Sequence, residues 1–173
     1  MHVPLLADDF IDRPARHYPE KTAIVDGDLR FTYAEFAERV DRLSNALLGL
    51  GLEQGDRVCM LGPNSHFYLE SFYATAQSGL ILVPLNFRLN PEDHEYIINH
   101  AGVKAVLVDY EYVGMVDSIR DRLPKVEHWI VAAYDKADCP GWTDWNEMVA
   151  DASGDAPVRP ERDENDLVSI NYT

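Results

Sequence analysis

Residues 57–85, "RVCMLGPNSHFYLESFYATAQSGLILVPL", decide the fold, because their pattern is that of a strand, a helix and a second strand in succession. The run "RVCML" is short and continuously apolar, which is typical of a strand that is covered on both faces. The segment "HFYLESFYATAQS" is apolar nearly all round and is followed by Gly79, so it predicts a buried, central helix. "LILVPL" is the next strand. A unit of this kind predicts parallel strands joined by a right-handed crossover.

The same alternation of strand and helix continues downstream. Asn90 and Pro91 predict the start of another helix, because asparagine caps helices and proline fits the first helical position, and Gly102 ends it. "KAVLVD" predicts a strand, Tyr112 to Leu123 a helix that Pro stops, and "EHWIVAA" a further strand. We therefore expect an α/β fold with an open, mostly parallel, doubly wound sheet and helices on both of its faces.

A hairpin and a helix are expected before this sheet. In "TAIVDGDLRFT", residues 22–32, two β-rich runs flank an Asp-Gly pair, which accepts the positive φ of a tight turn. Thr32 then begins "TYAE", in which Thr32 and Glu35 form the pattern of a capping box. Apolar residues follow at helical spacing, so one face of this helix is predicted to be buried, until Gly49 and Gly51 stop it.

The region after Asp135 is strongly acidic and differs from the alternating core. "WTDWNEMVAD" predicts a short helix with Trp142 and Trp145 on one face. Residues 153–166 are rich in proline and charge, which predicts an exposed connector. The final "DLVSINYT", residues 166–173, predicts a buried strand with no turn after it.

Composition and charge limit the classes of function. The 173 residues are enough for one domain, and the formal net charge of −15 argues against binding of nucleic acid or an anionic membrane, because both need basic patches. Cys59 and Cys139 have neither a CxxC nor a zinc spacing, so no disulfide framework is implied. No segment is apolar for long enough to span a bilayer, and the N-terminus lacks the pattern of a signal peptide. We therefore expect a cytoplasmic protein without an integral membrane segment.

Candidate binding residues lie at the carboxyl ends of the predicted parallel strands, where open α/β sheets bind ligands. This rule selects four places, namely residues 62–65, residues 84–88, the region of Asp109, and Thr173. Asp109 could hold a ribose, but no GxGxxG motif precedes it, so a Rossmann dinucleotide site is not supported. Ser65 lacks the GxSxG elbow of a nucleophile and is expected to cap a helix.

Arg88 is the most informative of these positions, because it is a cation on a loop that leaves a buried strand of an acidic protein. One interpretation is a surface arginine paired with Glu92 or Asp93. The other is a contact to a phosphate, which suits the planar fork of donors that arginine presents. The histidines are not spaced as metal ligands, and the residues supply no complete catalytic constellation.

Several of these segments together resemble the N-terminal part of a known enzyme family. The matching stretches are residues 30–89, which contain "TYAE", "GDRV", "PNS", "SG" and "VPLN" in this order, then "KAVLVD", and then the final "DLVSINYT". From Pro14 to Thr173 the sequence resembles the acyl-adenylate-forming, or AMP-binding, enzymes and is most similar to the bacterial fatty acyl-CoA synthetases. The resemblance implies that residues 1–173 are the N-terminal portion of the large adenylate-forming domain of a longer chain, ending at the start of its phosphate loop.

The resemblance also implies an AMP-forming ligase reaction. A carboxylic acid, in this branch a fatty acid, would react with ATP in the presence of Mg²⁺ to give an acyl-adenylate, and coenzyme A would then displace AMP. Thr173 matches the first threonine of the loop that holds the ATP phosphates, and Arg88 matches an arginine that contacts a phosphate of coenzyme A in some aryl-CoA ligases. No catalytic residue and no metal ligand is implied within these residues, so this chain alone is expected to be inactive.

Alternatives stay open at this stage. The enzyme could form a homodimer, and other branches of the family, the aryl-CoA ligases and the adenylation domains of peptide synthetases, share the same segments. A non-catalytic α/β module that retains only the fold is the alternative from a different class. A Gly/Thr-rich stretch ending in Pro-Lys-Gly after Thr173 would favour the enzyme.

Overall fold

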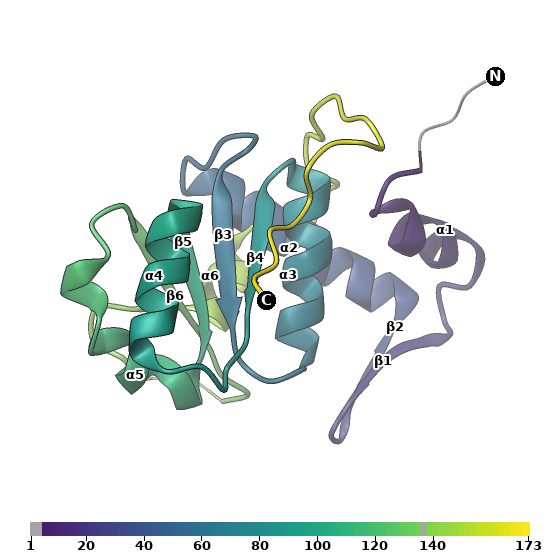
Figure 1. The fold of residues 1–173 in the computed structure, drawn as a ribbon. Coiled ribbons are helices and arrows are strands. Elements are labelled where there is room, and N and C mark those ends of the chain that lie inside the picture. The colour runs from purple at the N-terminus through teal and green to yellow at the C-terminus, as the bar shows by residue number, and fades with distance from the viewer. Residues whose placement is uncertain (1–4, 136–137) are drawn as a thin grey trace.

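A five-stranded parallel sheet forms the centre of the chain (Figure 1). The computed structural model describes residues 5–135 and 138–173. Within them the strand order is β4-β3-β5-β6-β7, so the predicted open, parallel sheet is confirmed. The strands are β3 (Arg57–Leu61), β4 (Ile81–Leu85), β5 (Val103–Asp109), β6 (His128–Ala132) and β7 (Thr143–Asp144).

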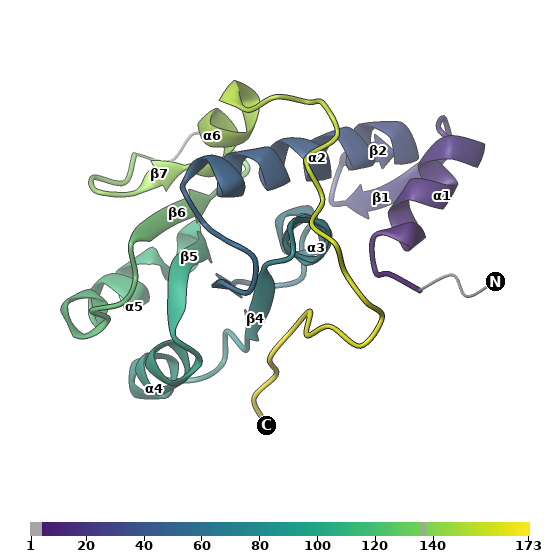
Figure 2. The ribbon, with the colours of Figure 1, turned by 90° about the horizontal axis from the view of Figure 1, so that it is seen from above.

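Helices cover both faces of this sheet, as expected for a doubly wound fold (Figure 2). One apolar core contains Val58 and Met60 of β3, whereas the other contains their neighbours Cys59 and Leu61, because successive strand residues point to opposite faces. On the first face lie α2 (Tyr33–Gly49), α3 (His66–Ser78) and α6 (Trp145–Asp151). On the second face lie α4 (Pro91–Ala101) and α5 (Val113–Asp117).

The predicted hairpin and capped helix precede the sheet. Strand β1 (Thr22–Asp26) pairs antiparallel with β2 (Leu29–Thr32), and Gly27 takes a positive φ of 56° at the turn. Thr32 and Glu35 form the predicted capping box of α2, in which the Thr32 side chain accepts from the Glu35 N–H and the Glu35 carboxylate accepts from the Thr32 N–H. A helix that the sequence did not indicate, α1 (Asp9–His17), comes first, and Pro14 lies inside it, which explains why its pattern was missed.

Helix α3 is central, as predicted from its apolar pattern. Its N-cap is Ser65, whose side chain accepts from the Tyr68 N–H, and its C-cap is Gly79 at a φ of 71°. Most of its residues are buried, including Glu70. Leu69 and Phe72 are the exceptions on this helix, since both are more than a third exposed.

The predicted helix from Tyr112 to Leu123 is wrong in its length. The chain forms a 3₁₀ turn at Tyr110–Tyr112, the short α5, and a second 3₁₀ turn at Arg120–Arg122. Two local features break the helix. Gly114 weakens it from within, and the hydroxyl of Ser118 donates to the carbonyl of Met115 at 2.6 Å in competition with the backbone.

The prediction that Trp142 and Trp145 share one helix face is also wrong. Thr143 and Asp144 form β7, so α6 begins only at Trp145. Trp145 is fully buried against Phe67 in the first core, whereas Trp142 packs against Trp129 beside the second core. Thr143 and Asp144, the latter also the N-cap of α6, separate the two tryptophans, whose rings therefore lie on opposite faces of the sheet.

The final segment is not the buried strand that its pattern predicted. Only Ser169 forms a bridge, parallel to Leu82 of β4, and Leu167 and Val168 are exposed. Val168 accepts from the Leu82 N–H at 3.0 Å, and the Ile170 N–H donates to the Leu82 carbonyl at 2.9 Å. The next N–H of β4 on this side would come from Pro84, which has none, so the ladder stops.

Residues 153–166 contain no helix or strand and run over the first face of the molecule, from α6 across α2 (Figure 2). Side chains of the body hold this segment along its length. The Asn45 amide donates to the carbonyls of Ser153 and Asp155 at 2.8 Å, and Gln54 donates to the carbonyl of Glu161 at 3.3 Å. Within the described residues, no helix combines the length and the apolar character that a membrane span requires.

Candidate functional site

The carboxyl edge of the sheet, where the parallel strands end, contains a topological switch point. The chain leaves β3 through α3 on the first face, and it leaves β5 through α5 on the second face. Because β3 and β5 are neighbours, the two connections diverge and leave a crevice between them. Open α/β sheets bind their ligands at such a place.

A cavity of about 430 Å³ lies at this crevice. Next to the lining residue Pro63, Gly62 has no room for a side chain, because a Cβ there would lie only 2.8 Å from the Cβ of Asp109. Glycine therefore allows the ends of β3 and β5 to approach each other. The cavity is lined by Pro63, Asp109, Tyr110, Glu111, Ala133, Tyr134 and Asp135.

Asp109 is the buried charge of this cavity, since its residue is only 6% exposed. Burial raises the pKa of its carboxyl group, the N–H of Glu111 opposes this shift by donating to Oδ1 at 3.0 Å, and the charge of Glu111 adds to it. The described lining residues provide carboxylates and tyrosines but no cation. This lining disfavours a phosphate, and the ribose contact considered for Asp109 stays a prediction.

A polar cluster that the sequence did not predict lies beside this cavity. Asp26 accepts from the backbone N–H of His66 at 2.9 Å, from its Nδ1 at 2.6 Å, and from the hydroxyl of Tyr134 at 2.9 Å. Burial raises the pKa of Tyr134 to about 12, and the bond to Asp26 adds to this effect. Burial also disfavours the ionised form of Asp26, but its bonds to His66 and Tyr134 outweigh that effect and lower its pKa. The cluster joins the hairpin to α3 and to the loop after β6.

Arg88 lies on the loop that follows β4. It is exposed, and its guanidinium carbon lies 4.8 Å from the centre of the Phe87 ring. The interpretation that Arg88 pairs with Glu92 or Asp93 is wrong, because no described carboxylate lies within ion-pair distance of it. Phe87 in turn contacts Tyr112 at 5.8 Å, so this loop lies beside the loop that follows β5. The guanidinium is thus held by an aromatic ring while its donors face solvent.

Thr173 is exposed and follows the segment that lies along the outer edge of β4. Its neighbour Tyr172 is half-buried, and its hydroxyl is 2.7 Å from Nδ1 of His100 on α4. The structure therefore places Arg88 beyond the end of β4 and Thr173 beside this strand. Asp109 is two strands further into the sheet.

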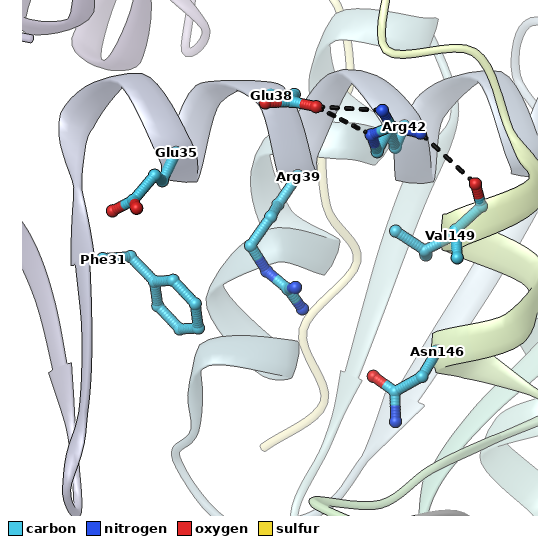
Figure 3. A pocket seen from close by; sticks show the side chains of 8 residues that line it. Phe31, Glu35, Glu38, Arg39, Arg42, Asn146 and Val149 are labelled. Atoms are coloured by element: carbon cyan, nitrogen blue, oxygen red, sulfur yellow. Dashed lines mark hydrogen bonds and ion pairs between the residues drawn. The ribbon is translucent and has the colours of Figure 1, made fainter.

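A second cavity, of about 540 Å³, lies between α2 and α6 (Figure 3). The figure shows Arg39 and Arg42 of α2 pointing toward it, but both guanidinium groups are already engaged. Arg39 pairs with the fully buried Glu70 at 2.5 Å, and Arg42 pairs with Glu38 at 2.9 Å and donates to carbonyls near the end of α6. Both arginines beside this cavity therefore already have partners within the protein.

The described residues do not offer a metal site, because no group of three His, Cys, Asp or Glu side chains is placed to hold an ion. His94 is fully buried on α4, and neither ring nitrogen has a hydrogen bond of regular geometry within the described residues. Burial lowers its pKa, although the charge of Asp93 and the backbone of Leu89 oppose this shift. It is a core histidine rather than a ligand.

The strand order and the two helical layers define a doubly wound α/β domain. The chain belongs to the AMP-binding enzyme family, whose profile matches residues 11–173. It is 31% identical to a 4-hydroxybutyrate–CoA ligase of Metallosphaera sedula over 98% of this chain and 31% of that protein. It is 36% identical to a long-chain-fatty-acid–CoA ligase of Thermus thermophilus over 89% of this chain and 29% of that protein.

A solved structure supports the same assignment. The crystal structure of the anthranilate CoA ligase AuaEII in complex with anthranoyl-AMP matches with a TM-score of 0.92 and 26% identity. The match covers 100% of this chain and 33% of that one. The chain thus spans about a third of the length of the proteins that it matches.

Proposed function

We propose that residues 1–173 form the N-terminal part of an AMP-forming acyl-CoA ligase. In this reaction a carboxylate attacks the α-phosphate of ATP and releases pyrophosphate, and the thiol of coenzyme A then displaces AMP from the acyl-adenylate. The observation that carries the proposal is the family match over nearly the whole chain, together with relatives that are CoA ligases. The structure is compatible with it, since the fold agrees over the full length of this chain.

Two residues of this chain would contact substrates. Arg88 would bind a phosphate of coenzyme A, and the support for this role is a guanidinium that is exposed and without an ionic partner among the described residues. Thr173 would contact the phosphates of ATP, and it is exposed at the edge of β4. Mg²⁺ would neutralise phosphate charge in the first step, but the described residues do not fit a metal site, so its ligands would lie elsewhere.

The substrate class that we propose is a small or fatty carboxylic acid. The long-chain-fatty-acid–CoA ligase and the 4-hydroxybutyrate–CoA ligase both support an aliphatic acid. An aromatic acid is the second candidate, because the structure of an anthranilate CoA ligase superimposes on the whole chain. A cytoplasmic location and a homodimeric assembly are further parts of the proposal.

The test is an assay of AMP release by the longer protein that contains these residues. We expect AMP in the presence of ATP, Mg²⁺, coenzyme A and a member of a panel of aliphatic and aromatic acids. The 173-residue chain is the matched control and should give no AMP. Acyl-adenylate formation without thioester would indicate another branch of the family, and no AMP with any acid would favour a non-catalytic module.

A further inference from the structure

The segment that ends at Thr173 has a side-chain anchor on α4. We propose that His100 is a positioning residue that acts through Tyr172 to hold residues 166–173 along the edge of β4. The role of this anchor for ATP rests on the proposed function of Thr173. The anchoring itself depends only on contacts within the described residues.

Three aromatic side chains build the anchor. The hydroxyl of Tyr172 lies 2.7 Å from Nδ1 of His100, and the two rings meet edge to face with centres 5.8 Å apart. The His100 ring in turn stacks on Tyr96, four residues earlier on α4, with centres 5.4 Å apart and planes tilted by 20°. Tyr96, although 62% exposed, thus supports the plane of the imidazole from one side, and the imidazole bonds to the hydroxyl of Tyr172.

The backbone alone holds this segment weakly. Leu82 makes two hydrogen bonds to it, one with Val168 and one with Ile170, and Pro84 cannot supply the next one. Leu167 is 58% and Val168 46% exposed, so burial of apolar surface contributes little at the start of the segment. The bond between Tyr172 and His100 is therefore the side-chain hydrogen bond nearest to Thr173 in the described structure.

The position of this bond decides its effect. Tyr172 precedes Thr173 directly, and consecutive Cα atoms are only about 3.8 Å apart, so fixing Tyr172 restricts where Thr173 can lie. A residue that is held before its ligand arrives loses less conformational entropy on binding. The expected consequence is tighter binding of the ATP phosphates without any effect on the chemical step.

Amide hydrogen exchange tests the anchor in the 173-residue chain. The Ile170 N–H, which bonds to Leu82, reports whether the segment stays on β4. Tyr172→Phe and His100→Phe each keep an aromatic ring and remove the hydrogen bond. We expect each variant to raise the Ile170 exchange rate about three- to tenfold, the range that corresponds to one net hydrogen bond. The double variant should exchange no faster than either single one.

Tyr18→Phe is the control, because it makes the same chemical change at a residue that lies after α1 and makes no contact with this segment. It should leave Ile170 exchange unchanged. An unchanged rate in Tyr172→Phe, or a double variant in which the two fold-increases multiply, would overturn the anchor.

The link to ATP is tested in the longer protein. Both single variants should raise the KM for ATP about three- to tenfold and leave kcat within twofold, while Tyr18→Phe should have no effect. Faster exchange with an unchanged KM would overturn the link between the anchor and Thr173. If the longer protein releases no AMP at all, the proposed ligase function fails, and the exchange experiment still decides on the anchor.

Discussion

Among single residues, Asp109 is the group whose charge conflicts most with its surroundings at the carboxyl edge. Burial raises its pKa above the ordinary value of 3.8, so the folded chain binds this proton more readily than the unfolded chain does. Ionisation of Asp109 therefore costs stability as the pH rises above 3.8, and this cost is absent below that value, where both states are protonated. We expect Asp109→Asn to raise the free energy of unfolding near neutral pH and to leave it unchanged below pH 3.8, as measured by urea denaturation.

Asp135→Asn is the matched control for this prediction, because Asp135 is exposed, lines the same cavity and is not among the groups that shift the pKa of Asp109. It should change stability little at either pH. A loss of stability in Asp109→Asn near neutral pH would show that a partner supports the carboxylate, which would contradict the role of burial.

Arg88 leads to a prediction about coenzyme A that belongs to the proposed function. A hydrogen bond to a charged group contributes about 1.5–3 kcal/mol, so Arg88→Ala should raise the KM for coenzyme A by about tenfold or more. The rate of pyrophosphate release in the first step should stay the same. The measurement is steady-state kinetics of the longer protein with each half-reaction followed separately. Arg30→Ala on the hairpin is the control, since Arg30 is also exposed, and equal effects of both substitutions would contradict a specific contact.

At the level of elements, Gly79 joins the end of α3 to residues 153–166. Its φ is 71°, and a Cβ there would lie 2.7 Å from Cγ of Pro160 and 3.0 Å from Cγ of Gln54. Gly51, after α2, has a φ of 86° but faces open space. Gly51→Ala should therefore lower the free energy of unfolding only by the cost of placing alanine in a left-handed backbone conformation, about 1–2 kcal/mol. Gly79→Ala should cost more, because the rigid proline ring must also move, and chemical denaturation of both variants measures the difference.

This pair of substitutions separates backbone strain from packing. An equal loss of stability in both variants would show that Pro160 moves away freely. That result would contradict close packing of the irregular segment against the C-terminus of α3.

The elements that the sequence predicted well are those with local signals. Caps and glycines mark both ends of α2, α3 and α4, and each of these helices begins and ends where those residues predict. The helix predicted from Tyr112 to Leu123 failed for local reasons, whereas the prediction for the final segment failed because of a tertiary partner. The pattern of residues 166–173 is that of a strand, but whether they pair is decided by Pro84, some eighty residues earlier, which ends the ladder on β4.

At the scale of the whole molecule, open α/β sheets bind ligands at the carboxyl ends of their strands. This rule predicted where the candidate site lies but not which side chains it contains. Arg88, Asp109 and the loop at Gly62 were selected from the strand pattern, and the structure places them along one edge of the sheet. The cluster of Asp26, His66 and Tyr134 was not predicted. Its members are 40 and 108 residues apart, and only the folded chain brings them together.

A buried ion network joins the start of α1 to the irregular segment after α6. Asp8 is 1% exposed and accepts from Arg159 at 2.7 Å and from Arg162 at 2.8 Å, about 150 residues later. Arg159 also pairs with Asp12, and Arg162 donates to the carbonyl of Ala76 at the end of α3. The network therefore holds the segment before α1 and the irregular segment after α6 against the same helix.

Removal of the Asp8 carboxylate should loosen both segments. Burial disfavours the charge of Asp8, but the bonds and charge of Arg162 outweigh it and lower the pKa. The stabilisation is thus present above the ordinary value of 3.8 and is lost as the pH falls through the lower folded value. Asp8→Asn should reduce the free energy of unfolding by about 1.5–3 kcal/mol near neutral pH and flatten its decline in acid, measured by urea denaturation.

Limited proteolysis then shows where the fold opens. Trypsin should cut Asp8→Asn faster after Arg162, whereas Arg159 is followed by proline and should resist in both proteins. Asp9→Asn is the matched control, because Asp9 is exposed and, among residues 5–135 and 138–173, its Oδ2 accepts only from the nearby Leu6 N–H at 3.1 Å. Equal cleavage of the wild-type chain and Asp8→Asn after Arg162 would contradict the network, because the irregular segment would then be held to the body without its buried ion pairs.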